Sequence, residues 1–237
     1  MSKKKNEIKP GERRTWFKCV KALLKVFVKK PKFVFLGKEF EDRSLVLSNH
    51  VGASAPLTLE CYFPKPFRFW GTYEMNSSVK EVYKYLSRVY FNQKKHWNLF
   101  FAQAFCVLAA PVAWLFYRGL TLISTYRDYR FRNTLKESLK TIEAGANLVI
   151  FPEDSSNGYF NTITGFYSGF VTLAGVCYKK GYDLPIYLSY LRKSENVYVV
   201  DAPVYYSELI ATGKDKYQIA EEFRERCNYL GVMELPE

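Results

Sequence analysis

Short apolar runs alternate with segments in which apolar residues recur every three or four positions, and this alternation constrains the fold most strongly. The clearest runs are residues 45–47 and 148–151, which have the length and composition of buried strands. Strands that alternate with helices form parallel β-α-β units. The sequence therefore predicts a single α/β domain, with a mostly parallel central sheet flanked by helices.

The same patterns place the individual elements. We expect strands at residues 32–36, 45–47, 67–70, 120–123, 148–151, 185–190 and 197–200. We expect helices near residues 78–91, 169–180 and 219–227, and one from Phe131 that Gly145 ends. No linker divides residues 32–237, which we assign to one domain.

Residues 1–31 precede this domain and predict a basic amphipathic helix closed by Pro31. Its expected apolar face comprises Trp16, Phe17, Val20, Leu23, Leu24, Phe27 and Val28, and its expected basic face Lys18, Lys21, Lys25 and Lys29. Such a helix can lie on an anionic membrane surface, or it can pack on the core like any surface helix. The pattern leaves both interpretations open.

Residues 97–117 contain no charged side chain, which is a sufficient length for a membrane span. The alternative is a buried helix, or a pair of helices interrupted at Pro111. We therefore expect a location on the cytoplasmic side of a membrane, either peripheral or with a short hydrophobic insertion.

The formal net charge of +12 indicates anionic partners: nucleic acid, acidic lipid headgroups or a phosphorylated substrate. No nucleic-acid-binding motif is present, so we expect no nucleic acid partner. The five cysteines are scattered and include no C-x-x-C pair. This predicts reduced thiols and no metal site.

Polar residues follow the two clearest strands. Asn49 and His50 come after residues 45–47, and Glu153 follows the other run. Because the carboxyl ends of parallel strands meet at one edge of a sheet, we expect these side chains to approach one another. His50 lies in a turn of small residues, where its imidazole could act as a general base. His96, in a basic stretch, is expected on the surface.

Two further segments could bind substrate. Arg127 follows a predicted strand, and arginine grips phosphate through its forked donors. Glu153, Asp154 and Ser155 form a polar loop that could bind hydroxyls or phosphate oxygens, although an exposed turn has the same composition.

Across roughly residues 33–203, these motifs resemble those of the glycerolipid acyltransferase family, which makes phosphatidic acid from lysophosphatidic acid. Asn49 and His50 match the start of its N-H-x-x-x-x-D block. The second block looks like Gly119, Ile123 and Arg127. The third, F-P-E-G-T-R-S, is matched by Phe151, Pro152 and Glu153, with Ser155 in place of the threonine, and the fourth resembles Leu184-Pro185-Ile186.

The resemblance implies transfer of a fatty acyl group from acyl-CoA or acyl-carrier protein to a hydroxyl of a lysolipid or another acceptor. His50 and Asn49 would be the catalytic residues, with His50 as the general base, and no metal or bound organic cofactor would be needed. Substrate contacts would come from Gly119, Arg127, Phe151, Pro152, Glu153, Asp154 and Ser155.

The chain departs from the family pattern at three positions. Ala55 stands where the family has the aspartate that orients the histidine, and Asp154 and Ser156 replace the glycine and arginine of the third block. Glu60, Asp154 or no residue could take the place of the aspartate. The sequence therefore leaves a second hypothesis open: a catalytically impaired, lipid-binding protein on the membrane.

Overall fold

The computed structural model describes residues 9–156, 158, 160 and 162–236. The strands are β1 (Lys32–Phe35), β2 (Leu45–Ser48), β3 (Phe67–Thr72), β4 (Ile123–Thr125), β5 (Asn147–Ile150), β6 (Pro185–Arg192), β7 (Val197–Val200) and β8 (Val204–Tyr205). The helices are α1 (Thr15–Phe27), α2 (Ser54–Tyr62), α3 (Tyr73–Asn76), α4 (Val79–Lys84), the π-helix η1 (Tyr85–Lys94), α5 (Leu99–Leu120), α6 (Phe131–Glu143), α7 (Gly169–Tyr178), α8 (Tyr206–Ala211) and α9 (Lys216–Val232).

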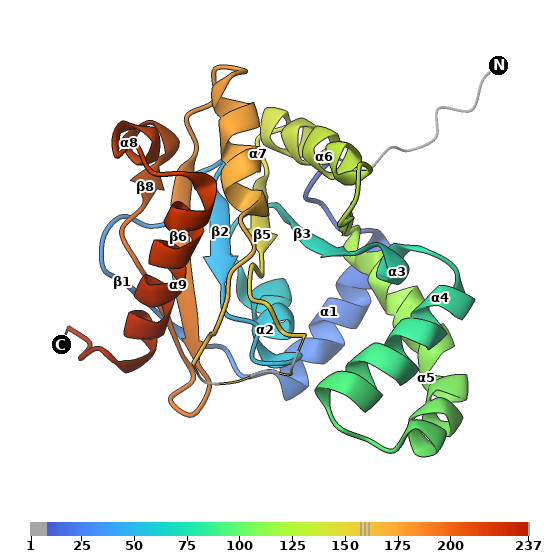
Figure 1. Cartoon of the computed structure of the whole chain (residues 1–237). Coiled ribbons are helices and arrows are strands. Elements are labelled where there is room, and N and C mark those ends of the chain that lie inside the picture. The colour runs from blue at the N-terminus through green and yellow to red at the C-terminus, as the bar shows by residue number, and fades with distance from the viewer. Residues whose placement is uncertain (1–8, 157, 159, 161, 237) are drawn as a thin grey trace.

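One sheet runs through the molecule in the order β1-β7-β6-β2-β5-β3-β4, with β8 beside β6 (Figure 1). Its neighbouring strands are parallel, except that β6 runs antiparallel to β7 and β8. The predicted α/β fold with a mostly parallel sheet is confirmed. Gly145, at φ 86°, follows α6 as predicted, because glycine adopts the left-handed conformation that ends many helices.

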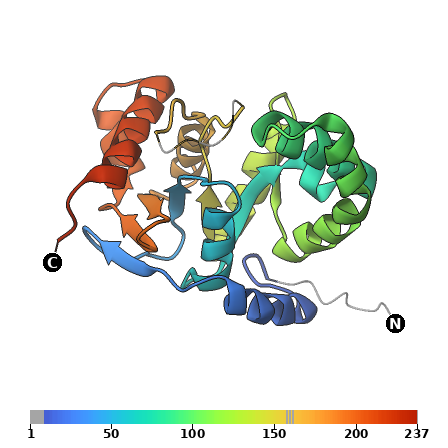
Figure 2. The ribbon, with the colours of Figure 1, turned by 90° about the horizontal axis from the view of Figure 1, so that it is seen from below.

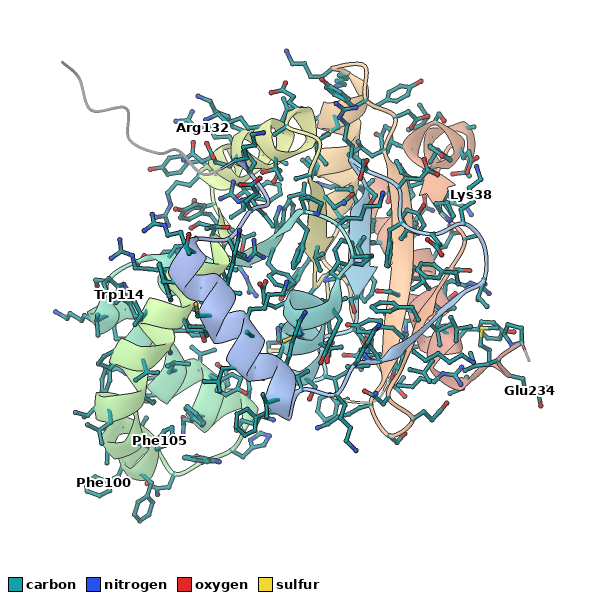
Figure 3. The ribbon with its side chains drawn as sticks, turned by 180° about the vertical axis from the view of Figure 1, so that it is seen from behind. Lys38, Phe100, Phe105, Trp114, Arg132 and Glu234 are labelled. Atoms are coloured by element: carbon teal, nitrogen blue, oxygen red, sulfur yellow. The ribbon has the colours of Figure 1, made fainter. Side chains whose placement is uncertain are left out.

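Helices cover both faces of the sheet. Helices α6, α7 and α9 lie on the face toward the viewer in Figure 1, whereas α1 and α2 lie on the opposite face, seen in Figure 3. Successive side chains of β2 serve the two faces in turn, since Leu45 and Leu47 belong to one apolar cluster and Val46 to the other. Burial on both faces explains why this strand reads as a continuous apolar run.

A helical hairpin formed by α4, η1 and α5 is inserted between β3 and β4 and stands to one side of the sheet (Figure 2). Its own small core contains Val82, Leu86, Cys106 and Ala110. Helix α5 continues through Pro111, and most of its length is exposed. The expected interruption at Pro111 is wrong, because α5 is continuous there. The buried-helix alternative is also wrong, because the helix packs on the rest of the protein through one narrow face only.

The predicted division of the N-terminal helix into an apolar and a basic face is wrong in part. Phe17 is fully buried beside Gly119, whereas Leu23 and Phe27 are exposed. Lys21 turns inward, with its Nζ 3.9 Å from a carboxylate oxygen of Glu60. The helix packs on the domain through Phe17, and this contact fixes which side faces solvent. Residues 1–8 of the predicted helix lie outside the described part of the chain.

Some elements differ from the expectation in position. Helix α5 extends through Leu120, so β4 begins only at Ile123 rather than at residue 120. Patterning also missed the short elements α2, α3, β8 and α8. These have few residues over which a periodic pattern can develop.

Candidate functional site

The site forms where β2 and β5 end. The two strands are parallel neighbours, with Leu47 paired to Ile150, so the residues that follow them leave the sheet at the same edge. The backbone N–H of His50 donates a hydrogen bond to Oε2 of Glu153 at 3.0 Å. Two residues predicted from separate motifs are thus in contact.

The turn after His50 positions the imidazole. Val51 and Gly52 both adopt the left-handed conformation, with φ 42° and 63°. A β-branched residue rarely adopts it, and such strain is concentrated at functional sites. The turn brings the carbonyl oxygen of Gly52 against Nδ1 of His50 in a short contact. Because a carbonyl can only accept, Nδ1 carries the proton of the neutral ring and Nε2 holds the lone pair.

The surroundings of His50 favour the neutral ring. Its ring centroid lies 4.8 Å from that of Phe151. Burial lowers the pKa of His50 to about 4, and the charges of Lys94 and Lys95 act in the same direction. The imidazole is therefore an unprotonated base at neutral pH.

This shift predicts a pH dependence of stability. Between pH 4 and pH 6.5 the unfolded chain binds a proton at His50 that the folded chain does not bind. The contribution of His50 to the free energy of unfolding is therefore complete above about pH 6.5 and is lost as the pH falls toward 4. We expect the free energy of unfolding to fall by about 2 kcal/mol more in the wild type than in a His50→Gln variant over this range. Urea unfolding at several pH values measures this free energy. The same pH dependence in the wild type and in the variant would contradict the prediction.

Lysines from the helical hairpin reach this edge of the sheet. Nζ of Lys94 donates to Oγ of Ser155 at 2.6 Å, and Nε2 of Gln93 donates to the carbonyl of Ser156 at 3.1 Å. A Cβ placed on Gly52 would lie 3.5 Å from Nζ of Lys95. The hairpin therefore supplies positive charge to the loop after β2 and to the loop after β5.

Burial and charge act against each other in this cluster. Burial lowers the pKa of the Lys94 ammonium, and the carboxylates of Glu153 and Asp154 oppose the shift. Burial likewise raises the pKa of Glu153, opposed by the hydrogen bond from His50 and by the charge of Lys94. Sequence reasoning missed Lys94 and Lys95. The available signal was a lysine doublet at the end of a helical pattern, which was interpreted only as a solvated stretch around His96.

Arg127 is connected through Tyr167 to the loop that follows β5, residues 151–156. Its guanidinium donates to the Tyr167 hydroxyl at 2.9 Å and lies 4.9 Å from the centre of that ring. The Tyr167 hydroxyl also hydrogen-bonds Asp154. Burial raises the pKa of Asp154, but this bond and those from Ser156 outweigh it and hold that pKa below its usual range. Arg127, Asp154 and Ser155 thus belong to one network with Lys94.

Other predicted site residues have structural contacts. The side-chain amide of Asn49 hydrogen-bonds both the N–H and the carbonyl of Leu191, which ties the end of β2 to β6. The carbonyl of Pro152 accepts from the N–H of Tyr167. Gly119 lies before β4, at the end opposite Arg127, where a Cβ would meet the ring of Phe17 at 1.9 Å. The structure does not bring Gly119 to the site.

Glu60 does not replace the missing aspartate. Its carboxylate accepts from Nε of Arg13 at 3.0 Å and from Nη2 at 2.6 Å, and both side chains are buried. Ala55 is buried in the apolar cluster beneath α1. At His50, the carbonyl of Gly52 occupies Nδ1, where the family pattern would place a carboxylate. The ring is oriented, but by a neutral group.

The arrangement places a neutral imidazole near the carboxylate of Glu153 and the ammonium groups of Lys94 and Lys95. Within the described part of the chain, no three His, Cys, Asp or Glu side chains gather as metal ligands do. No protein-family model matches this chain, and no curated protein matches it either.

Proposed function

We propose that the protein is an acyltransferase that moves a fatty acyl group from a thioester donor, acyl-CoA or acyl-carrier protein, to a hydroxyl of a lysophospholipid-like acceptor. The observation that carries this proposal is the fixed tautomer of His50, whose Nδ1–H is held by Gly52 while Glu153 holds the backbone of the same residue. The motif resemblance supplies the reaction class.

In the proposed reaction, Nε2 of His50 takes the proton of the acceptor hydroxyl as its oxygen attacks the thioester carbon. The ammonium of Lys95, which lies close to Gly52, would stabilise the oxyanion that forms. The carbon–sulfur bond then breaks, and the imidazolium returns the proton to the leaving thiolate. The products are an ester and a free thiol.

The cations of the site favour an acceptor that carries a negative charge. Arg127 and Lys94 flank the loop of Asp154 and Ser155, and a phosphate group there could accept hydrogen bonds from both. The family arginine is absent at Ser156, so Lys94 supplies a positive charge from a different segment.

The exposed side of α5 supports a membrane surface as the partner. This helix is long and apolar enough to cross a bilayer by length and composition, and Phe100 and Leu108 are 72% and 80% exposed. Figure 3 shows Phe100 and Phe105 at the end of α5 farthest from Trp114. On α1, Phe27 is 77% exposed. Large apolar side chains that are exposed next to one another commonly mark an interaction site.

We expect a Phe100→Ser, Phe101→Ser, Leu108→Ser variant to bind phosphatidylcholine–phosphatidylglycerol vesicles about tenfold or more weakly, because it removes exposed apolar area from α5. A matched control carries serine at Ile210, Tyr217 and Val232, which are also exposed but lie on α8 and α9. Vesicle sedimentation measures the binding. Equal loss in both variants would contradict a docking role for α5.

A second candidate function follows from Ala55 and from the neutral orienting group on His50. In a serine-protease triad, disabling the orienting acid lowers turnover by ~10⁴-fold. A chain that binds lipid without measurable turnover would fit this observation. Mass spectrometry of a lysophospholipid incubated with acyl-CoA separates the candidates: a diacyl product formed above background supports the enzyme, and vesicle binding without product supports the binding protein.

A further inference from the structure

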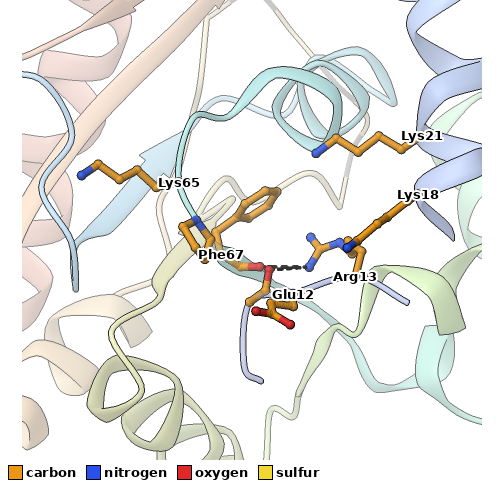
Figure 4. Close-up of a pocket in the computed structure, with 8 residues that line it drawn as sticks. Glu12, Arg13, Lys18, Lys21, Lys65 and Phe67 are labelled. Atoms are coloured by element: carbon orange, nitrogen blue, oxygen red, sulfur yellow. Dashed lines mark hydrogen bonds between the residues drawn. The ribbon is translucent and has the colours of Figure 1, made fainter. Parts of the chain in front are cut away.

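A second concentration of positive charge lies away from the His50 site, near the start of β3. A cavity of about 320 Å³ is lined by residues of the segment that leads into α1 and of the chain entering β3, among them Glu12, Arg13, Lys18, Lys21, Lys65 and Phe67 (Figure 4). The strands of the His50 site end at the opposite edge of the sheet, because β3 runs parallel to β5 and its first residue, Phe67, pairs with Asn147.

The cavity is built from specific contacts rather than from a chance gap. Nη1 of Arg13 donates to the carbonyl of Phe67 at 3.0 Å, and the guanidinium lies 4.8 Å from the centre of the Phe67 ring. Gly11, at φ 91°, allows the chain to approach Ala146 so closely that a Cβ would lie 2.8 Å away. These contacts hold the N-terminal segment against β3 and fix one wall of the cavity.

Basic side chains outnumber acidic ones along the cavity, since Arg13, Lys18, Lys21 and Lys65 line it beside one carboxylate, that of Glu12. The carboxylate of Glu60 is already held by Arg13, and Lys21 approaches it only at 3.9 Å. Burial lowers the pKa of Lys21, and the charge of Glu60 opposes this shift. Lys65 pairs with Asp42, which is largely exposed. An anion in the cavity would meet the ammonium groups of Lys18 and Lys21, which extend from α1.

We propose that this cavity binds a phosphate-class anion, either a free phosphate compound or the headgroup of an anionic phospholipid. Lys18 and Lys21 extend from α1 toward Phe67 in Figure 4, whereas Lys65 comes from the turn before β3 and its ammonium points away from them, toward Asp42. The guanidinium of Arg13 is hydrogen-bonded to Glu60, so Arg13 forms part of the cavity wall and is not expected to bind the anion. The inference is independent of acyl transfer at His50.

The test uses the full chain with inorganic phosphate as the probe. Binding to the folded state raises the melting temperature, so phosphate should stabilise the wild type more than chloride at equal ionic strength. A Lys18→Gln, Lys21→Gln, Lys65→Gln variant should bind phosphate at least tenfold more weakly, because it loses the charge-assisted contacts. A control with glutamine at Lys179, Lys180 and Lys216 has the same net charge and should bind as the wild type does.

The outcomes are distinct. If the cavity variant fails to fold, Lys18→Gln, Lys65→Gln, which alters two lysines that reach solvent, replaces it. Sedimentation with phosphatidylcholine vesicles, with and without phosphatidylglycerol, identifies the source of the anion. If the cavity variant loses the extra binding that phosphatidylglycerol gives the wild type, the anion is a lipid headgroup. If this extra binding is unchanged in the variant, the anion is a free phosphate compound. Equal stabilisation by chloride, or equal weakening in the control, would overturn the proposal.

Discussion

A His50→Ala variant is expected to lose acyl transfer by roughly 10³-fold or more, with its fold intact. General-base catalysis by a positioned side chain contributes on the order of 10² to 10⁴, and the proposed reaction has no other group for this step. The side chain is only partly buried, and the contact with Glu153 uses the backbone N–H, which alanine retains. Thiol release from acyl-CoA with a lysophospholipid acceptor measures the loss.

His96→Ala is the matched control for this experiment. It removes the other histidine of the chain, which is exposed and follows Lys95 directly. Activity near that of the wild type is expected. A His50→Ala variant that turns over as fast as His96→Ala would show that His50 is not the base.

Glu60→Leu is expected to cost about 3–5 kcal/mol of folding free energy, because it leaves the guanidinium of Arg13 buried without its carboxylate. Lys21 would lose its only nearby carboxylate among the described residues as well. Urea unfolding measures the loss.

The double variant Arg13→Met, Glu60→Leu separates pairing from packing. Removing both charges costs much less than removing one, since no buried charge is left uncompensated. If the single and double variants are equally destabilised, the ion pair is not the cause. Glu60→Gln should also leave the turnover of folded protein unchanged, because Glu60 is bonded to Arg13 rather than to His50.

The sheet and the contact between His50 and Glu153 could be predicted because both depend on local pattern. The apolar run that ends at Leu47 marks a buried strand, and parallel strands bring their carboxyl ends together. Asn49 was predicted to be catalytic, but its side-chain amide forms hydrogen bonds with the backbone of Leu191 in β6. Side-chain partners across the sheet carry no periodic signal.

The rest of the site depends on long-range packing. Lys94 contacts Ser155 only because the helical hairpin packs against the loop that follows β5. No pattern in the sequence predicts this long-range contact. Lys21 faces inward because the buried pair of Arg13 and Glu60 lies beneath α1. Helix α5 passes Pro111 without a break. Pro111 is exposed, so water can satisfy the carbonyl that loses its helical hydrogen bond.

The central claim is that a neutral His50 activates the hydroxyl of a lysophospholipid toward a thioester. The most direct test compares wild-type thiol release from acyl-CoA in the presence of a lysophospholipid and of its deoxy analogue, which lacks that hydroxyl. The account predicts release, with formation of the diacyl product, for the hydroxyl-bearing lipid alone. Equal release with both lipids, or none with any hydroxyl acceptor from either acyl-CoA or acyl-carrier protein, would contradict it.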